Sequence, residues 1–274
     1  ADNVIGEPRA AHTGPALTWA ACEIERRDHD DPVMLCVHAD WSIGDAAAFR
    51  DTLSRAAAAA ARHEALVTVG IVPSRPDPGF GYIQPGEAIG NTIGEMRRVA
   101  RFVEKPNRAA AEQMVADGFL WNSGIFVWRT EDFLAEVEAH TSEIAPALPY
   151  AAAGDIAAFF TAVTPVSVDQ GVLERSRNVL VTPGEFGWDD VGTWAALRRV
   201  RTRDANGNAV TGDAHVVQSR DCVVFAEGQT AVLYGVSDLV VVTRAGLTVV
   251  TTVERAADLK TLLDALPPHV RDRR

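Results

Sequence analysis

The segments FVEKP (residues 102–106) and WNSGIF (residues 121–126) decide how this chain is interpreted. FVEKP predicts a strand that ends at Pro106, because proline donates no backbone hydrogen bond and keeps the preceding residue extended. The alanine-rich residues 107–117 then predict a short helix. A second apolar strand is expected over residues 119–128, interrupted by Asn-Ser-Gly at residues 122–124. The pattern brings polar side chains to the end of an apolar layer.

Four polar side chains in these segments suit a sugar phosphate. Glu104 and Asn122 can bind hydroxyl groups, and the ammonium of Lys105 can meet a phosphate as a point charge, while Ser123 brings a hydroxyl to the same segment. Spacing alone also fits a solvated Glu-Lys pair followed by an ordinary Asn-Ser-Gly turn. The residue types leave both interpretations open.

The two segments together resemble the sugar-binding half of the nucleotidyltransferases that join a sugar 1-phosphate to a nucleoside triphosphate, in particular the mannose-1-phosphate guanylyltransferases. The resemblance implies an α/β fold with a Rossmann-like nucleotidyltransferase domain at residues 1–203. It also implies a small left-handed β-helix domain with a terminal helix at residues 204–274. The short valine-rich segments and regular turns after Asp204 predict strands. They match that second domain in total length and in the spacing of strands and turns.

The N-terminal segment resembles the part of this family that approaches the nucleotide base. Glu7 and Thr13 stand in the matching positions, and the resemblance implies that they contact the nucleotide. His12 and Gly14 depart from the usual asparagine and alanine. Thr13 is also a credible cap for a helix that is expected to follow it.

Two further segments resemble parts of the sugar site. The loop PDPGFGYI (residues 76–83) resembles a glycine loop whose backbone meets the sugar, which implies roles for Gly79 and Gly81. SVDQGVLE (residues 167–174) resembles a helix start that contributes an aspartate, here Asp169. Ordinary turn glycines and simple helix capping by Asp169 are the structural alternatives.

Two aspartates are candidate metal ligands. Asp40 follows a continuous apolar run at residues 33–37, which predicts a strand buried on both faces. Open α/β sheets bind ligands at the ends of such strands. A turn or helix cap explains Asp40 equally well. Asp190, with Asp189 beside it, lies in FGWDDVGTW (residues 186–194), which resembles the second metal site of the family. The resemblance implies that Asp40 and Asp190 hold Mg²⁺, a cation that prefers oxygen ligands.

The resemblance implies transfer of GMP from GTP to α-D-mannose 1-phosphate, which yields GDP-mannose and pyrophosphate. Lys105, Asp40 and Asp190 are the expected catalytic residues, because this chemistry depends on positioning and charge neutralisation. A homodimer is also expected, since a β-helix leaves an exposed end that a second copy can cover.

The glycine-rich phosphate loop at the start of this family is not among the 274 residues. We therefore expect these residues to belong to a longer protein and to be inactive or weakly active alone. Two alternatives stay open. One is a nucleotidyltransferase for another sugar phosphate or base, and the other is a non-catalytic regulatory subunit that binds a sugar nucleotide.

Composition narrows the class of protein. A formal charge of -11 and a pI near 5.1 argue against binding to nucleic acid or an anionic membrane surface. Cys22, Cys36 and Cys222 are far apart, as expected of reduced cysteines in a cytoplasmic protein. The sequence has no run of about 20 apolar residues, so no transmembrane helix is predicted.

Overall fold

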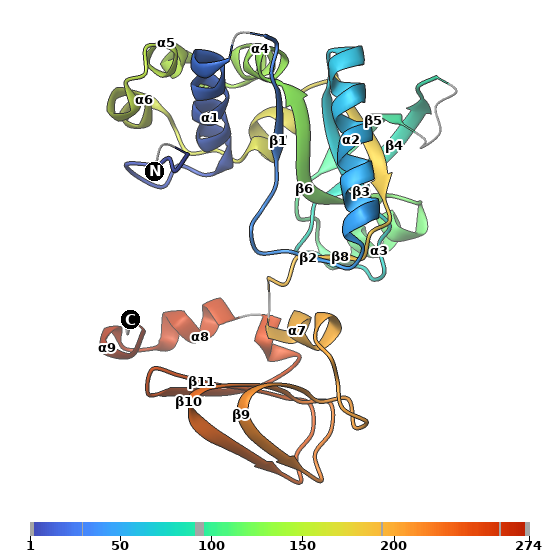
Figure 1. Cartoon of the computed structure of the whole chain (residues 1–274), viewed down its shortest axis with the longest axis vertical. Coiled ribbons are helices and arrows are strands. Elements are labelled where there is room, and N and C mark those ends of the chain that lie inside the picture. Colours follow the sequence, from blue (N-terminus) through green and yellow to red (C-terminus); the bar gives the residue numbers. More distant parts are fainter. Residues whose placement is uncertain (1–2, 29, 91–95, 193, 258, 272–274) are drawn as a thin grey trace. The chain divides into compact units, whose positions relative to one another are not determined.

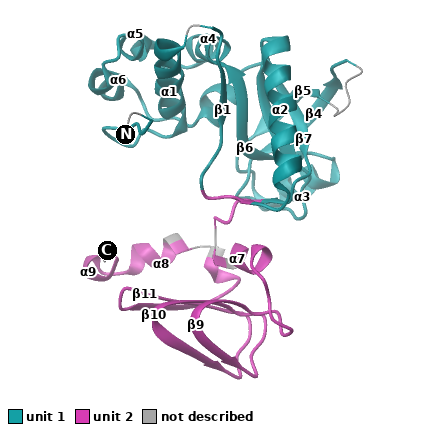
Figure 2. Ribbon diagram, in the orientation of Figure 1, with its two compact units in different colours: residues 1–39, 43–188 teal, residues 40–42, 189–274 magenta. Residues whose placement is uncertain are grey.

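The computed structural model describes residues 3–28, 30–90, 96–192, 194–257 and 259–271. The chain forms two compact units, one of residues 1–39 and 43–188 and one of residues 40–42 and 189–274 (Figure 2). This boundary lies earlier in the chain than the one expected at Asp204. Helix α7 (Trp194–Val200) belongs to the second unit because its Trp194 and Leu197 pack against Val223 and Val240 there.

Helices and strands are interspersed along the first unit, which gives it an α/β architecture (Figure 1). In chain order they are α1 (Thr13–Arg27), β1 (Val33–Cys36), β2 (Ser42–Ile43), α2 (Ala46–His63), β3 (Leu66–Ile71), β4 (Tyr82–Ala88), β5 (Arg97–Val103), α3 (Arg108–Ala116), β6 (Leu120–Arg129), α4 (Thr130–His140), η1 (Ala145–Ala147), α5 (Leu148–Ala152), α6 (Ile156–Ala162), the π-helix η2 (Asp169–Leu173), β7 (Val179–Gly184) and β8 (Trp188–Asp189). The unit boundary passes through the short paired strands β2 and β8.

A mixed six-stranded sheet of order β1-β6-β3-β7-β5-β4 forms the centre of the first unit. Strands β3 and β7 are parallel, whereas β6 runs antiparallel to β1, β3 and β4. Every residue of β3 is buried, as expected for a strand in the middle of a sheet that is covered on both faces. The α/β architecture predicted from the sequence is therefore present.

Helices cover both faces of this sheet. Alternate residues of neighbouring strands point to opposite faces, so Val67, Val127 and Leu180 meet Ala56 and Ala60 of α2 on one side. On the other side, α1 and α4 cover the sheet (Figure 1) and contribute to a large aromatic core. That core includes Trp19, Trp128, Phe133, Phe159 and Phe160.

Two strand predictions need correction. The apolar run at residues 33–37 was expected to be buried on both faces, but Leu35 is 43% exposed and Val37 is 52% exposed. Among the described residues β1 pairs only with β6 and lies at the sheet edge. Strand β6 also runs without interruption through residues 122–124, because Asn122 and its neighbours pair with β3 across a register shift.

The second unit is a small β module. Its elements are α7, β9 (Ala209–Val217), β10 (Val223–Tyr234), β11 (Leu239–Arg244), β12 (Leu247–Thr252), η3 (Arg255–Ala257), α8 (Leu259–Ala265) and α9 (Pro268–Arg271). Strands β9, β10 and β11 are parallel neighbours, and β12 returns antiparallel to β11. Only residues 218–222 join β9 to β10, which is too short to cross back over a flat sheet. The chain must therefore coil at this point.

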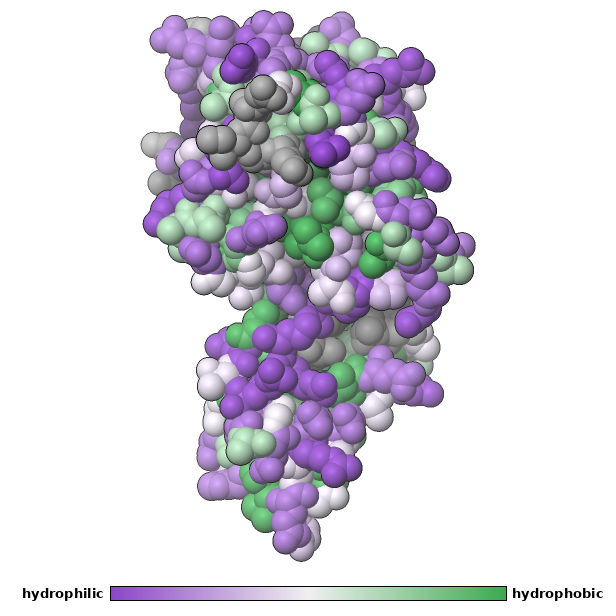
Figure 3. All heavy atoms as spheres, turned by 90° about the vertical axis from the view of Figure 1, so that its right-hand side faces the viewer, coloured by the Kyte–Doolittle hydropathy of each residue, from purple (hydrophilic) through white to green (hydrophobic). Residues whose placement is uncertain are grey.

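The surface is mostly hydrophilic on the face shown in Figure 3, where hydrophobic residues form small separate groups. In the described part of the chain, no helix is long and apolar enough to span a membrane. All three cysteines are buried thiols. Burial raises the pKa of Cys36 to about 12, which disfavours its reactive thiolate.

Candidate active site

The first unit brings four of the sequence-predicted sugar-site residues together. The side-chain amide of Asn122 donates to Oδ1 of Asp169 at 2.9 Å, and its backbone N–H donates to the carbonyl of Gly81 at 2.8 Å. A Cβ at Gly81 would lie only 2.6 Å from Oε2 of Glu104, so the glycine lets that carboxylate approach the loop. Lys105 donates from Nζ to Oε1 of Glu104 at 2.6 Å. The residue before β4, residues from β6 and η2, and the turn after β5 thus meet in one place.

Lys105 has an unusual backbone. Its φ of 47° lies in the left-handed region, which disfavours residues with a Cβ, and Pro106 follows directly. The Lys105 side chain is 65% exposed, whereas that of Glu104 is only 12% exposed. The turn therefore holds the carboxylate inward and leaves the ammonium within reach of solvent and of a ligand.

The orientation of Asn122 is set by its neighbours. Oδ1 of Asn122 accepts from Oγ1 of Thr68 at 3.1 Å and from the backbone N–H of Gly124 at 3.3 Å. Thr68 is fully buried in β3. Because two donors point at the amide oxygen, the amide nitrogen must face Asp169.

Asp169 is the most perturbed carboxyl group of this cluster. Burial is the largest cause and the charge of Glu104 the next, and together they raise the pKa of Asp169 to about 6. The hydrogen bond from Asn122 and the charge of Lys105 act in the opposite direction. A hydroxyl-rich ligand placed here would find one carboxylate, one amide and one carboxyl group that can change protonation near neutral pH.

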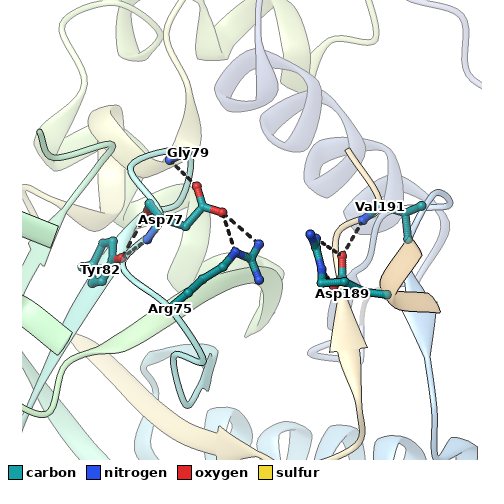
Figure 4. A network of polar contacts seen from close by, with 7 residues as sticks. Arg75, Asp77, Gly79, Tyr82, Asp189 and Val191 are labelled. Carbon is teal, nitrogen blue, oxygen red and sulfur yellow. Dashed lines mark hydrogen bonds and ion pairs between the residues drawn. The ribbon is translucent and has the colours of Figure 1, made fainter. Parts of the chain in front are cut away.

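The glycine loop is organised by Asp77, which the sequence did not single out (Figure 4). Oδ1 of Asp77 accepts from the N–H of Gly79 at 3.0 Å, and Oδ2 accepts from Nε of Arg75 at 3.0 Å. The Tyr82 hydroxyl accepts from the Asp77 N–H and donates to the Asp77 carbonyl. These contacts hold the loop in one shape on both sides of Gly79.

Aromatic rings support the same loop. The guanidinium carbon of Arg75 lies 5.0 Å from the ring centroid of Trp121 and 5.7 Å from that of Phe80. The rings of Phe80 and Trp121 are 4.8 Å apart. These cation–π and ring contacts anchor the loop to β6, the strand that carries Asn122.

Thr13 contacts the sugar-site segment. It is the first residue of α1, whose N-cap is His12, so Thr13 is not the cap expected from the sequence. Its Oγ1 accepts from the N–H of Val168, the residue before Asp169, at 3.0 Å. Close packing explains why position 14 is glycine, since a Cβ there would lie 2.6 Å from the carbonyl oxygen of Val166.

Glu7 is exposed and lies outside any helix or strand. Its segment is tied down by Arg9, which donates from Nε to the carbonyl of Phe160 at 2.6 Å and from its terminal nitrogen to the carbonyl of Val163 at 2.7 Å. The structure thus fixes the backbone near Glu7 and leaves its carboxylate on the surface.

The two candidate metal ligands, Asp40 and Asp190, belong to the second unit. Asp40 is exposed and Asp190 is half-buried, and burial raises the pKa of Asp190 above its ordinary value. The neighbouring Asp189 accepts from Nε of Arg199 at 2.6 Å and from the N–H of Val191 at 3.2 Å (Figure 4). Within the described ranges, no group of three or more His, Cys, Asp or Glu side chains is arranged to hold a metal.

Sequence reasoning missed three contributors to the site: Thr68, Asp77 and Glu174. Asp77 carries a usable signal, because Asp-Pro-Gly is typical of a turn in which the aspartate binds a backbone N–H two residues on. Thr68 lies in a buried apolar strand, and Glu174, whose Oε1 accepts from the backbone N–H of Glu104 at 2.9 Å, ends the SVDQGVLE segment. Neither of these two has a local pattern that reveals its partner.

Comparisons with known proteins show which family and fold this chain resembles. A family profile described as nucleotidyl transferase matches residues 2–207. Mannose-1-phosphate guanylyltransferases of Klebsiella pneumoniae and Escherichia coli are each 36% identical to this chain, over 98% of the chain and 59% of the relative. A crystal structure described as mannose-1-phosphate geranyltransferase from Thermus thermophilus matches with a TM-score of 0.85 and 30% identity, covering 95% of this chain and 76% of that one. The chain spans 59% of the length of those two curated relatives.

Proposed function

The chain belongs to the nucleotidyl transferase family, and we propose on that premise that it serves the transfer of GMP from GTP to α-D-mannose 1-phosphate. The observation that carries the proposal is the cluster of Gly81, Glu104, Asn122 and Asp169 with Lys105 beside it. Its donors and acceptors suit sugar hydroxyls, and its ammonium suits a phosphate. The names of the relatives support mannose and guanine as the sugar and the base.

In the proposed reaction, an oxygen of the sugar phosphate forms a bond to the α-phosphorus of GTP. The bond from that phosphorus to the bridging oxygen breaks, and its electron pair leaves with pyrophosphate. Asn122, Asp169 and Glu104 would bind the sugar hydroxyls. Lys105 would neutralise the attacking phosphate, so that catalysis rests on positioning and charge compensation.

We propose that Mg²⁺ is held by Asp40 and Asp190. Both side chains supply the hard oxygen atoms that Mg²⁺ prefers, and one or two carboxylates together with phosphate oxygens make a common Mg²⁺ site. Burial disfavours the charge of Asp190, and a bound cation would offset that cost. When bound, Mg²⁺ supplies neutralisation of the charge on the triphosphate.

The lysine content allows a direct test of the sugar-phosphate site. Lys105 and Lys260 are the two lysines of the sequence, so peptide mapping after reductive methylation measures Lys105 separately from Lys260 and from a terminal amine. Mannose 1-phosphate is expected to slow methylation of Lys105, while the rate at Lys260 stays the same. Free mannose at the same concentration is expected to protect much less. Equal protection by both sugars would mean that Lys105 does not meet the phosphate.

A release assay for pyrophosphate tests the reaction itself. Each of the four nucleoside triphosphates is combined with mannose 1-phosphate or glucose 1-phosphate, with and without Mg²⁺. At most weak turnover is expected, and only with GTP and mannose 1-phosphate, because the glycine-rich phosphate loop of the family is not among these residues. It should fall further in Lys105→Ala but not in Arg244→Ala, whose exposed side chain contacts Glu227 in the second unit. GDP-mannose binding with the same affinity in the presence and absence of Mg²⁺, measured by calorimetry, would instead favour a sugar-nucleotide-binding regulatory subunit.

We also propose that the second unit is a left-handed β-helix. Support comes from the parallel neighbours β9, β10 and β11 and from the short connection at residues 218–222. Gly212 adds to this support, since its φ is +88° and a Cβ would lie 1.8 Å from the carbonyl oxygen of Ala226 in the next strand. The hand of the coil in a crystal structure would test the proposal.

A homodimer is proposed through this second unit. Val232 and Tyr234 of β10 are 68% and 69% exposed, and Val217 pairs beside Tyr234 and is 48% exposed. Apolar residues gathered in this way suit an interface. Light scattering coupled to gel filtration is expected to give twice 29.4 kDa, and Tyr234→Glu is expected to reduce it to the monomer mass. A monomer at all concentrations would contradict the proposal.

A further inference from the structure

The segment after Asp169 forms a π-helix, in which the N–H of Glu174 donates to the carbonyl of Asp169 at 2.8 Å. Such turns are rare and often mark functional sites. In an α-helix, side chains five positions apart point about 140° away from each other. The wider π turn reduces this angle, so Asp169 and Glu174 can face the same part of the first unit.

Both carboxylates contact the candidate sugar-phosphate site, but in different ways. Asp169 accepts from the side chain of Asn122, as described above. Glu174 accepts through Oε1 from the backbone N–H of Glu104 at 2.9 Å. Glu174 therefore contacts the main chain of the residue whose side chain lies over Gly81.

The backbone amide of Glu104 lies in the turn between the end of β5 and the side chain of Lys105. It comes directly after Val103, the last residue of β5, and before Lys105 with its left-handed backbone. Pro106 has no N–H to donate. The contact with Glu174 therefore fixes the turn between the end of the sheet and the two charged side chains. A turn free to relax here would move the Glu104 carboxylate and the Lys105 ammonium together.

We propose that Glu174 is a positioning residue for the sugar-phosphate site, acting through the Glu104 amide and set in place by the π turn. The inference rests on the proposed function, because it names the site that binds mannose 1-phosphate. It does not require Glu174 to contact the ligand. What Glu174 provides is an acceptor oxygen at a defined distance from the end of β5.

Three variants separate this role from a merely structural one. Glu174→Gln keeps an acceptor oxygen at the same reach, Glu174→Asp keeps the charge but shortens the reach, and Glu174→Ala removes the acceptor. Glu112→Ala is the matched control, since Glu112 is an exposed glutamate on α3 paired with Arg108. Amide hydrogen exchange and calorimetric titration with mannose 1-phosphate are measured on each whole chain.

The Glu104 amide is expected to exchange at least about 10-fold faster in Glu174→Ala and Glu174→Asp, while Glu174→Gln stays close to the wild type. Affinity for mannose 1-phosphate is expected to fall about 10-fold in the same two variants and less than about threefold in Glu174→Gln. Exchange at amides of β3 should not change in any variant, which shows that the fold is intact.

Unchanged affinity in Glu174→Ala would overturn the inference while leaving the proposed function in place. Equal losses in Glu174→Gln and Glu174→Ala would also overturn it, because charge rather than an acceptor would then be responsible. A wild-type chain that does not bind mannose 1-phosphate would overturn the proposed function and, with it, the ligand role of Glu174. The exchange rates of the Glu104 amide would still report whether the contact exists.

Discussion

Replacing Asp169 with asparagine is expected to stabilise the folded chain at neutral pH. Burial and the charge of Glu104 raise the pKa of Asp169 from an ordinary 3.8 to about 6. This shift is roughly 2 units, and at 1.36 kcal/mol per unit it corresponds to about 3 kcal/mol of stability lost when the group is ionised. Asparagine carries no charge, and its side-chain oxygen can still accept from Asn122.

The sign of the pH dependence follows from linkage. Between pH 4 and pH 6, the folded chain keeps the Asp169 proton while the unfolded chain has lost it, because the folded pKa is the higher one. The contribution of Asp169 to the free energy of unfolding therefore falls as pH rises through this window, and it levels off above about pH 6. Asp169→Asn should remove this part of the slope. Its gain should be near zero at pH 4 and largest above pH 7.

Urea unfolding at several pH values between 4 and 8, followed by tryptophan fluorescence, measures the effect. Asp117→Asn is the control, since Asp117 is exposed and contacts only the side chain of Gln113 among the contacts described for its carboxylate. A gain of about 1–3 kcal/mol at pH 7.5 that disappears at pH 4 would support the reasoning. The reasoning fails if Asp169→Asn matches the wild type at pH 7.5, or if its gain is the same at both pH values.

Three other substitutions test the glycine loop of the first unit and a contact between two strands of the second unit. Gly81→Ala should weaken mannose 1-phosphate binding about 10-fold in calorimetry with little change in melting temperature, because the new Cβ displaces the flexible Glu104 carboxylate; a large loss of stability would contradict this. Gly212→Ala should cost about 3 kcal/mol or more in thermal unfolding, since the new Cβ meets backbone and φ is +88°; an unchanged melting curve would refute it. Asp77→Ala should speed hydrogen exchange at the Gly79 amide about 10-fold and cost about 1 kcal/mol, and unchanged exchange would show that Asp77 does not organise the loop.

Local pattern was enough to predict much of the architecture. Helix α3 lies within the predicted residues 107–117, and β6 occupies most of the strand expected over residues 119–128. These elements follow from periodicity, proline position and helix propensity, which act over a few neighbouring residues. The motif residues Gly81, Glu104 and Asn122 were also named from the sequence, through resemblance to a family.

Contacts between residues far apart in the sequence could not be predicted from the same local patterns. The N–H of Glu104 meets Glu174, and the hydroxyl of Thr13 meets the N–H of Val168, across 70 and 155 positions of the chain. The sheet register and the π turn bring these partners together, and a one-residue slip in either would separate them.

The residue types of the site and the α/β class of the first unit could be predicted without coordinates, because both are carried by short local segments. Tertiary structure alone decided that β1 is an edge strand with exposed Leu35 and that Asp169 has a raised pKa. It also decided that Glu174 contacts the turn before Lys105. Burial, charge proximity and hydrogen-bond partners depend on which distant segments become neighbours, and only the folded chain settles that.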